Sequence, residues 1–148
     1  MEPFLGNPAF RTYAVCVALL VIKMIASAAY TASQRARVKG YVNPEDAAVA
    51  GGTELAASEI EQPEVARALR IQRNDLENIP LFFAIGLVYA LLGASSFGAT
   101  VYFWVFTMAR ILHTLAYIRN MQPARAICWG IGVLCLIGMS VAVIWKIV

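Results

Sequence analysis

Polar side chains recur at helical spacing inside segments of this sequence that are otherwise apolar. Arg70, Asn74 and Glu77 stand at positions i, i+4 and i+7, and Arg73 comes four residues before Glu77. Residues with this spacing share one face of a helix. An arginine-rich face suits a small anionic molecule, because a guanidinium group can bind a carboxylate through two parallel hydrogen bonds.

A second polar face follows on a later apolar segment. Arg110, His113 and Tyr117 stand at positions i, i+3 and i+7. Arg35 ends one apolar segment and Arg125 begins another. Ionisable side chains at membrane depth are expected to point into the protein and to find partners there. The pattern therefore predicts that polar groups from several helices meet at one level.

The arginines at this level outnumber the acids beside them. The local acids are Asp75 and Glu77, and the arginines are Arg35, Arg70, Arg73, Arg110 and Arg125. The surplus favours a bound anion. The alternative is a structural ion-pair network in which arginines and acids only lock helices together. His113 is the only histidine in the sequence, so we expect no metal site.

The composition indicates which elements carry these residues. Of the 148 residues, 60% are hydrophobic and 14% are charged, with a mean hydropathy of +0.67. Soluble domains are about 45–50% apolar and about 25% charged. The sequence therefore predicts a single all-α integral membrane domain over residues 1–148 and excludes a sizeable extramembrane domain.

Four transmembrane helices are predicted. Residues 12–34 contain one charge, Lys23, and residues 79–109 contain none over 31 positions. The second run is too long for one crossing and is interrupted at Gly93–Gly98, so it is read as two helices joined by a tight hairpin. The apolar part of its first half is short, so we expect that helix to begin near Arg73. The predicted spans are about 12–35, 73–92, 99–119 and 124–147, with a loop at about 36–72.

Basic residues predict the orientation of these spans. They concentrate in the first and third loops, whereas the hairpin has none. Because basic loops stay in the cytosol, we expect both termini on the opposite side.

Smaller features complete the prediction. Asn43 followed by Pro44 and two acids predicts a short helix over 44–50. Lys23 lies within the first span and requires a partner that the sequence does not identify. Small residues four apart, such as Gly138 with Ala142 and Ala126 with Gly130, would allow close helix packing.

Four segments in order carry a family resemblance. They are VNPEDA (42–47), RNDLENI (73–79), ARILHTLAY (109–117) and PARA (123–126). With them the chain resembles the membrane-associated proteins in eicosanoid and glutathione metabolism (MAPEG), above all the microsomal glutathione transferase and prostaglandin E synthase branch. The resemblance implies a homotrimer of four-helix subunits that binds glutathione between neighbouring subunits near the cytosolic face.

The resemblance also implies the roles of residues. Arg125 would stabilise the glutathione thiolate, with Tyr117 as a second catalytic residue. Glu77 would take the amine of the tripeptide, and the arginines would take its carboxylates. The predicted binding set is Arg35, Arg70, Arg73, Asn74, Glu77, Arg110, His113, Tyr117 and Arg125.

The implied activity is that of a membrane-bound glutathione transferase with a detoxification role, acting on lipophilic electrophiles, with peroxidase activity on lipid hydroperoxides as an extension. No nucleic-acid partner is expected. Two alternatives stay open: a prostaglandin E synthase-like isomerase and a lipid-binding scaffold without catalysis. The prostaglandin synthase pattern has Ser, Tyr and His where this chain has Ala126, Trp129 and Gln72. Asp46 does match the carboxylate associated with that synthase, or it serves only as a first-turn acid of the short helix.

Overall fold

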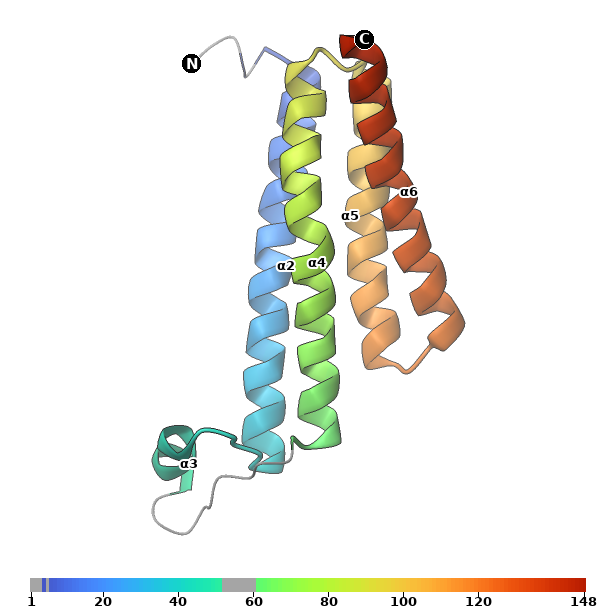
Figure 1. Cartoon of the computed structure of the whole chain (residues 1–148). Coiled ribbons are helices and arrows are strands. Elements are labelled where there is room, and N and C mark those ends of the chain that lie inside the picture. Colours follow the sequence, from blue (N-terminus) through green and yellow to red (C-terminus); the bar gives the residue numbers. More distant parts are fainter. Residues whose placement is uncertain (1–3, 5, 52–60) are drawn as a thin grey trace. The chain divides into compact units, whose positions relative to one another are not determined.

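The regular structure of the protein is helical. The computed structural model describes residue 4, residues 6–51 and residues 61–148, and within these residues there is no strand. This confirms the predicted all-α class. The helices, coloured along the chain in Figure 1, are α2 (Pro8–Val38), α3 (Pro44–Gly51), α4 (Pro63–Leu91), α5 (Ser96–Ile118) and α6 (Gln122–Ile147).

Three of the described helices are long and apolar enough to cross a membrane. They are α2, α5 and α6, and their ends lie within four residues of the predicted bounds. The short helix predicted over 44–50 is confirmed as α3. The fourth predicted crossing, α4, does not meet the same criterion, because its first half is rich in charged residues.

Helix α4 begins ten residues earlier than expected. We expected a start near Arg73, from counting apolar residues, but the helix starts at Pro63. Proline fits the first helical position, and Glu64 lies in the first turn, where a carboxylate is favoured by the helix dipole. A helix can extend beyond its apolar part, so the apolar count was the wrong guide to its start. The position of the membrane boundary along α4 stays a prediction.

The chain divides into two compact units. Unit 1 comprises Met1–Lys23 and Asp75–Val148, and unit 2 comprises Met24–Asn74. Unit 1 thus holds the first part of α2, the second part of α4, and the antiparallel pair α5 and α6, which pack against each other (Figure 1). Unit 2 holds the rest of α2, all of α3 and the first part of α4.

Aromatic side chains form the core of unit 1. Phe82 on α4 stacks on Phe106 of α5, with ring centroids 4.5 Å apart and an interplanar angle of 5°. Phe103 meets the edge of the Phe82 ring at 5.6 Å. Tyr13 on α2 packs against both and donates a hydrogen bond of 2.7 Å to the carbonyl of Phe83. These contacts hold α2, α4 and α5 together in this unit.

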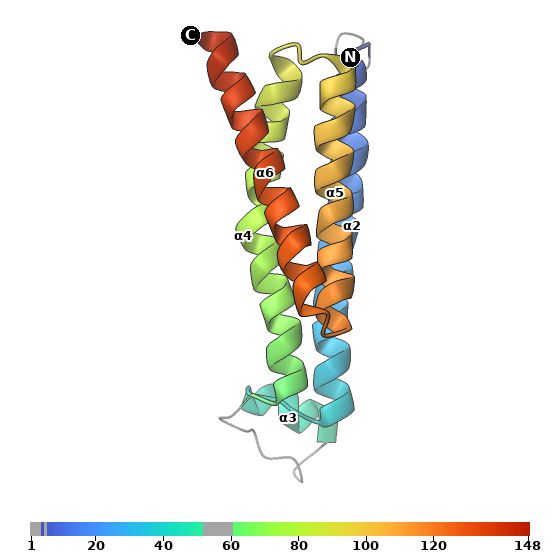
Figure 2. The same ribbon diagram turned by 90° about the vertical axis from the view of Figure 1, so that its right-hand side faces the viewer.

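The predicted hairpin between α4 and α5 is confirmed. Gly93 has a φ of 73°, which other residues rarely adopt, and Ser95 caps α5 by accepting a hydrogen bond of 3.1 Å from the Gly98 amide. The C-terminal end of α6 reaches this turn, where Lys146 Nζ donates a hydrogen bond of 2.8 Å to the Gly93 carbonyl (Figure 2).

Two glycines of α6 differ in what surrounds them. A Cβ atom at Gly138 would lie 2.7 Å from the Tyr102 ring on α5, whereas a Cβ atom at Gly130 would meet nothing within 4 Å. Gly138 therefore lets the two helices approach closely. No such contact surrounds Gly130, although the sequence pattern treats both glycines alike.

We expect Gly138→Ala to lower the stability of the protein by about 1–3 kcal/mol, because the added methyl group must displace the Tyr102 ring. The matched control is Gly130→Ala, which should be neutral or stabilise by up to about 1 kcal/mol through its higher helix propensity. Thermal unfolding in detergent measures both. Equal unfolding temperatures for the two variants would contradict the packing described for Gly138.

Candidate functional site

Unit 1 contains a buried ion pair where its parts of α2 and α4 end. Lys23 on α2 forms an ion pair with Asp75 on α4, and the two side chains are 9% and 2% exposed. Asp75 is thus the partner of Lys23 that the sequence did not identify. The sequence pattern places Asp75 among the acids facing the arginine-rich level and does not reveal this ion pair. The signal for it was a single lysine within the first span and an acid at the predicted start of the second.

Arg110 and His113 form the next part of the site. Arg110 on α5 is completely buried, and its Nη2 atom lies 3.2 Å from Nδ1 of His113, which is 3% exposed. Gly132 on α6 lies beside it, since a Cβ atom there would be in ordinary van der Waals contact with Arg110 Cδ and Nη1 at 3.7 Å. The predicted helical face is therefore present, and it is turned into the protein.

Tyr117 connects this pair to Arg125. The rings of His113 and Tyr117 meet edge to face, with centroids 5.7 Å apart. Arg125, near the start of α6, places its guanidinium carbon 4.5 Å from the centre of the Tyr117 ring and donates a hydrogen bond to Gln122. A cation over an aromatic face is held by the charge distribution of the ring. Within unit 1, the structure thus brings together Arg110, His113, Tyr117 and Arg125.

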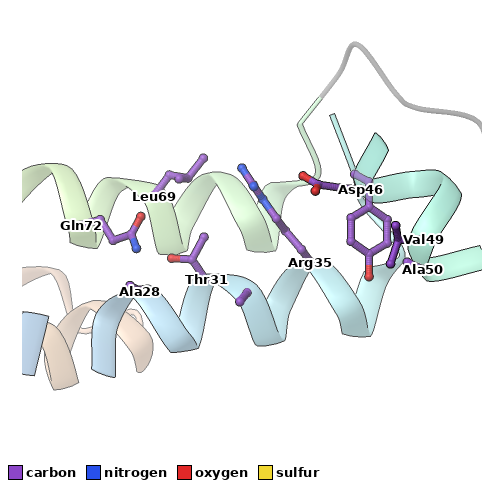
Figure 3. A pocket seen from close by; sticks show the side chains of 10 residues that line it. Ala28, Thr31, Arg35, Asp46, Val49, Ala50, Leu69 and Gln72 are labelled. Carbon is purple, nitrogen blue, oxygen red and sulfur yellow. The ribbon is translucent and has the colours of Figure 1, made fainter. Parts of the chain in front are cut away.

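Unit 2 contains a separate pocket with a volume of about 520 Å³. Figure 3 shows Arg35 and Thr31 of α2 and Gln72 of α4 turned toward the space between these helices, with Asp46 approaching from α3. Small-molecule sites are typically about 300–1,000 Å³, so the volume suits a small ligand. Arg35 is half-buried and also faces Glu61, with 3.4 Å between Nη2 and Oε1.

Asp46 is fixed at the mouth of this pocket. It lies in the first turn of α3 and accepts a hydrogen bond of 3.0 Å from the Asn43 side-chain amide. Its side chain also lines the pocket. Asp46 therefore fits both descriptions drawn from the sequence, the first-turn acid and the carboxylate of a site.

The other predicted residues lie on α4 in more open positions. Arg70 and Arg73 of unit 2 are exposed and are not among the residues that line the pocket, and Asn74 is half-buried. Glu77, in unit 1, is exposed. Their role in binding a ligand stays a prediction, as does that of the whole residue set.

Comparison with known proteins decides the family. The MAPEG family model matches residues 13–145. The chain belongs to the MAPEG family. The chain is 37% identical to prostaglandin E synthase of Homo sapiens over 143 residues, which is 96% of this chain and 92% of that protein. The bovine (Bos taurus) prostaglandin E synthase is 39% identical over 140 residues, 94% of this chain and 88% of that protein.

A relative with a different activity also matches. Microsomal glutathione S-transferase 1 of Rattus norvegicus is 40% identical over 126 residues, which is 84% of this chain and 79% of that protein. This MAPEG protein is thus similar to relatives named for two different reactions. The family, together with the three apolar helices, identifies a membrane protein.

We expect Lys23→Met alone to destabilise the protein strongly, by about 3–5 kcal/mol, because it leaves the buried Asp75 carboxylate without the lysine. The double variant Lys23→Met/Asp75→Leu should recover most of this loss, since an apolar pair of similar volume replaces a buried ion pair at little cost. Thermal unfolding in detergent measures both. A double variant less stable than Lys23→Met would contradict the pairing.

Proposed function

We propose that this protein is a membrane-bound glutathione transferase. The observation that carries the proposal is the arrangement in unit 1, where the Arg125 guanidinium lies over Tyr117 beside the buried Arg110 and His113. These residues are the ones to which the family resemblance assigns glutathione contacts. The similarity to a microsomal glutathione S-transferase supports the same reaction.

The basic groups suit the tripeptide. Glutathione has two carboxylates and one ammonium group, so arginines can bind its carboxylates and Glu77 its amine. In unit 2, Arg35 lines a pocket of about 520 Å³, a volume typical of small-molecule sites. We propose that Arg35 binds one of the carboxylates.

The proposed role of Arg125 follows from charge. A free thiol has a pKa near 8.5 and is only slightly ionised at neutral pH, whereas a fixed positive charge beside the sulfur favours the thiolate. The thiolate then attacks an electrophilic carbon, forming a carbon–sulfur bond as the leaving group departs with its electron pair. The contact with the Tyr117 ring keeps the Arg125 guanidinium in one place.

The second substrate is expected to arrive from the bilayer. Lipophilic electrophiles concentrate in the membrane, so a thiolate held on membrane helices meets them at high local concentration. Lipid hydroperoxides would give a peroxidase reaction. One glutathione thiolate attacks the peroxide oxygen, which releases an alcohol and leaves glutathione sulfenic acid. A second glutathione then reacts with the sulfenic acid to give glutathione disulfide and water.

A second candidate is an isomerase of the prostaglandin E synthase type. It is favoured by relatives with that name at 37–39% identity over nearly the whole chain. A product screen with a chlorinated aromatic electrophile and with a prostaglandin endoperoxide separates the two reactions. A scaffold without catalysis would bind no glutathione.

The assembly and orientation belong to the same proposal. We propose a homotrimer in which α4 forms a fourth membrane crossing and the glutathione site faces the cytosol. Native mass spectrometry in mild detergent should show trimers, and a spectrum of monomers alone would argue against a site shared by subunits.

Glutathione binding measured by calorimetry in detergent tests the function directly. We expect Arg35→Ala to weaken binding about 10- to 100-fold, since it leaves a ligand carboxylate without its partner, at about 1–3 kcal/mol. Arg37→Ala is the matched control, because Arg37 is exposed on the same helix and does not line the pocket. An absence of binding to the wild type would exclude the transferase, and equal binding by the two variants would remove Arg35 from the site.

We expect Arg125→Ala to lower turnover far more than it weakens glutathione binding. A shift of about two units in the thiol pKa is equivalent to about 2.7 kcal/mol, so loss of the charge should slow the reaction at pH 7 about 10- to 100-fold. Much of the rate should return at high pH, where the thiol ionises without help. The ultraviolet absorbance of bound thiolate and a pH–rate profile measure this.

The control for Arg125 is Arg119→Ala. Arg119 is an exposed arginine at the C-terminal end of α5, close to Arg125 in the chain. It should keep the thiolate signal and the rate. If Arg125→Ala keeps them as well, thiol activation belongs to another group, with Tyr117 or Arg35 as the next candidates.

A further inference from the structure

The Lys23–Asp75 ion pair has no assigned role in the proposed reaction. Both side chains are almost completely buried. A buried ion pair adds little net stability compared with a well-packed apolar pair, because removing two charges from water costs about as much as their attraction returns. Stability alone therefore does not account for the ion pair.

Arg110 on α5 interacts electrostatically with both members of the pair. The Asp75 carboxylate attracts the Arg110 guanidinium, whereas the Lys23 ammonium repels it. The Asp75 carboxylate thus offsets the repulsion between two buried cations, Lys23 on α2 and Arg110 on α5. Without Asp75 the two cations would repel each other in a medium that screens charge poorly. This attraction favours the buried position of Arg110.

Arg110 in turn determines the state of His113. A guanidinium group has five N–H donors and no acceptor, so in the 3.2 Å contact His113 Nδ1 must accept. A nitrogen that accepts carries no proton. His113 is therefore held as the neutral tautomer with its proton on Nε2, and this N–H is left to donate to another group.

His113 leads to the groups proposed to activate the thiol. Its ring packs on the edge of Tyr117, and Arg125 lies over the face of Tyr117. A rotation of the His113 ring would move Tyr117, and with it the surface on which Arg125 lies. The contacts thus form a continuous series from the ion pair to Arg125 within unit 1.

We propose that Lys23 and Asp75 are positioning residues: they hold Arg110 where it fixes the Nε2–H tautomer of His113, and through Tyr117 they set the position of Arg125. The effect on catalysis rests on the proposed glutathione transferase function. The effect on His113 does not, which allows the two to be tested separately.

The single histidine of the chain makes the test specific. Full-length protein labelled with ¹⁵N-histidine in detergent micelles gives signals from His113 alone, apart from any purification tag, which must be removed. In the wild type at pH 7.5 we expect one protonated nitrogen, Nε2, and one unprotonated nitrogen, Nδ1, with widely separated shifts. In Lys23→Met/Asp75→Leu and in Asp75→Asn the two shifts should move toward each other, because both tautomers become populated.

Kinetics supply the second measurement. Both variants should lose about tenfold or more in turnover, as expected for misplaced reacting groups. The matched control is Lys146→Met, which removes a lysine that contacts only the Gly93 carbonyl among the interactions described above. It should leave the histidine shifts and turnover as in the wild type.

The outcomes separate the hypotheses. If either variant folds and keeps both the wild-type histidine shifts and the turnover, the ion pair is purely structural and the proposal is overturned. Asp75→Asn preserves the size of the side chain, so it serves if the double variant does not fold. If the shifts change but the wild type binds no glutathione, the positioning of His113 stands and the transferase assignment fails.

Discussion

A lysine within an apolar helix must find an acid, and this requirement constrains how α2 and α4 meet in unit 1. A lone charge at the centre of a membrane costs at least about 2.5–3.5 kcal/mol, and more when it has no route to water. Asp75 meets this need for Lys23 and also attracts Arg110 on α5. The Asp75 carboxylate on α4 therefore attracts cations on both α2 and α5. The aromatic core of Tyr13, Phe82, Phe103 and Phe106 connects the same three helices through ring contacts.

The parts of the fold that depend on local sequence could be predicted. Charge-free runs identified α5 and α6, the Gly93 turn divided α4 from α5, and Asn43-Pro44 marked the start of α3. The start of α4 could not be predicted from an apolar count, because helix formation at Pro63 depends on backbone and dipole effects that continue outside the apolar segment. Local sequence patterns thus predict where helices occur better than they predict the ends of a helix that, like α4, is partly charged and partly apolar.

Contacts between helices were harder to foresee, because they depend on how each helix is rotated about its axis. The Arg110–His113 contact lies within one helix, so its spacing revealed it. The Lys23–Asp75 pair joins distant parts of the chain, and nothing in either segment specifies the partner. The glycines of α6 show the same limit. Only Gly138 is needed for a close approach to a side chain of α5, whereas Gly130 and Gly132 would each accept a Cβ atom, and residue type alone does not distinguish the three glycines.

The three positions at which this chain departs from the prostaglandin synthase pattern differ in their surroundings. Ala126 and Trp129 are exposed on α6. Gln72 instead lines the pocket of unit 2 together with Asp46. Asp46 is the one carboxylate among the described residues lining this pocket, and no histidine lines it. A histidine exchanges protons near neutral pH, whereas the amide of Gln72 does not. A transferase needs a thiolate and an electrophile but no proton transfer at that place. An isomerase that opens a peroxide must move a proton, so the glutamine favours the transferase.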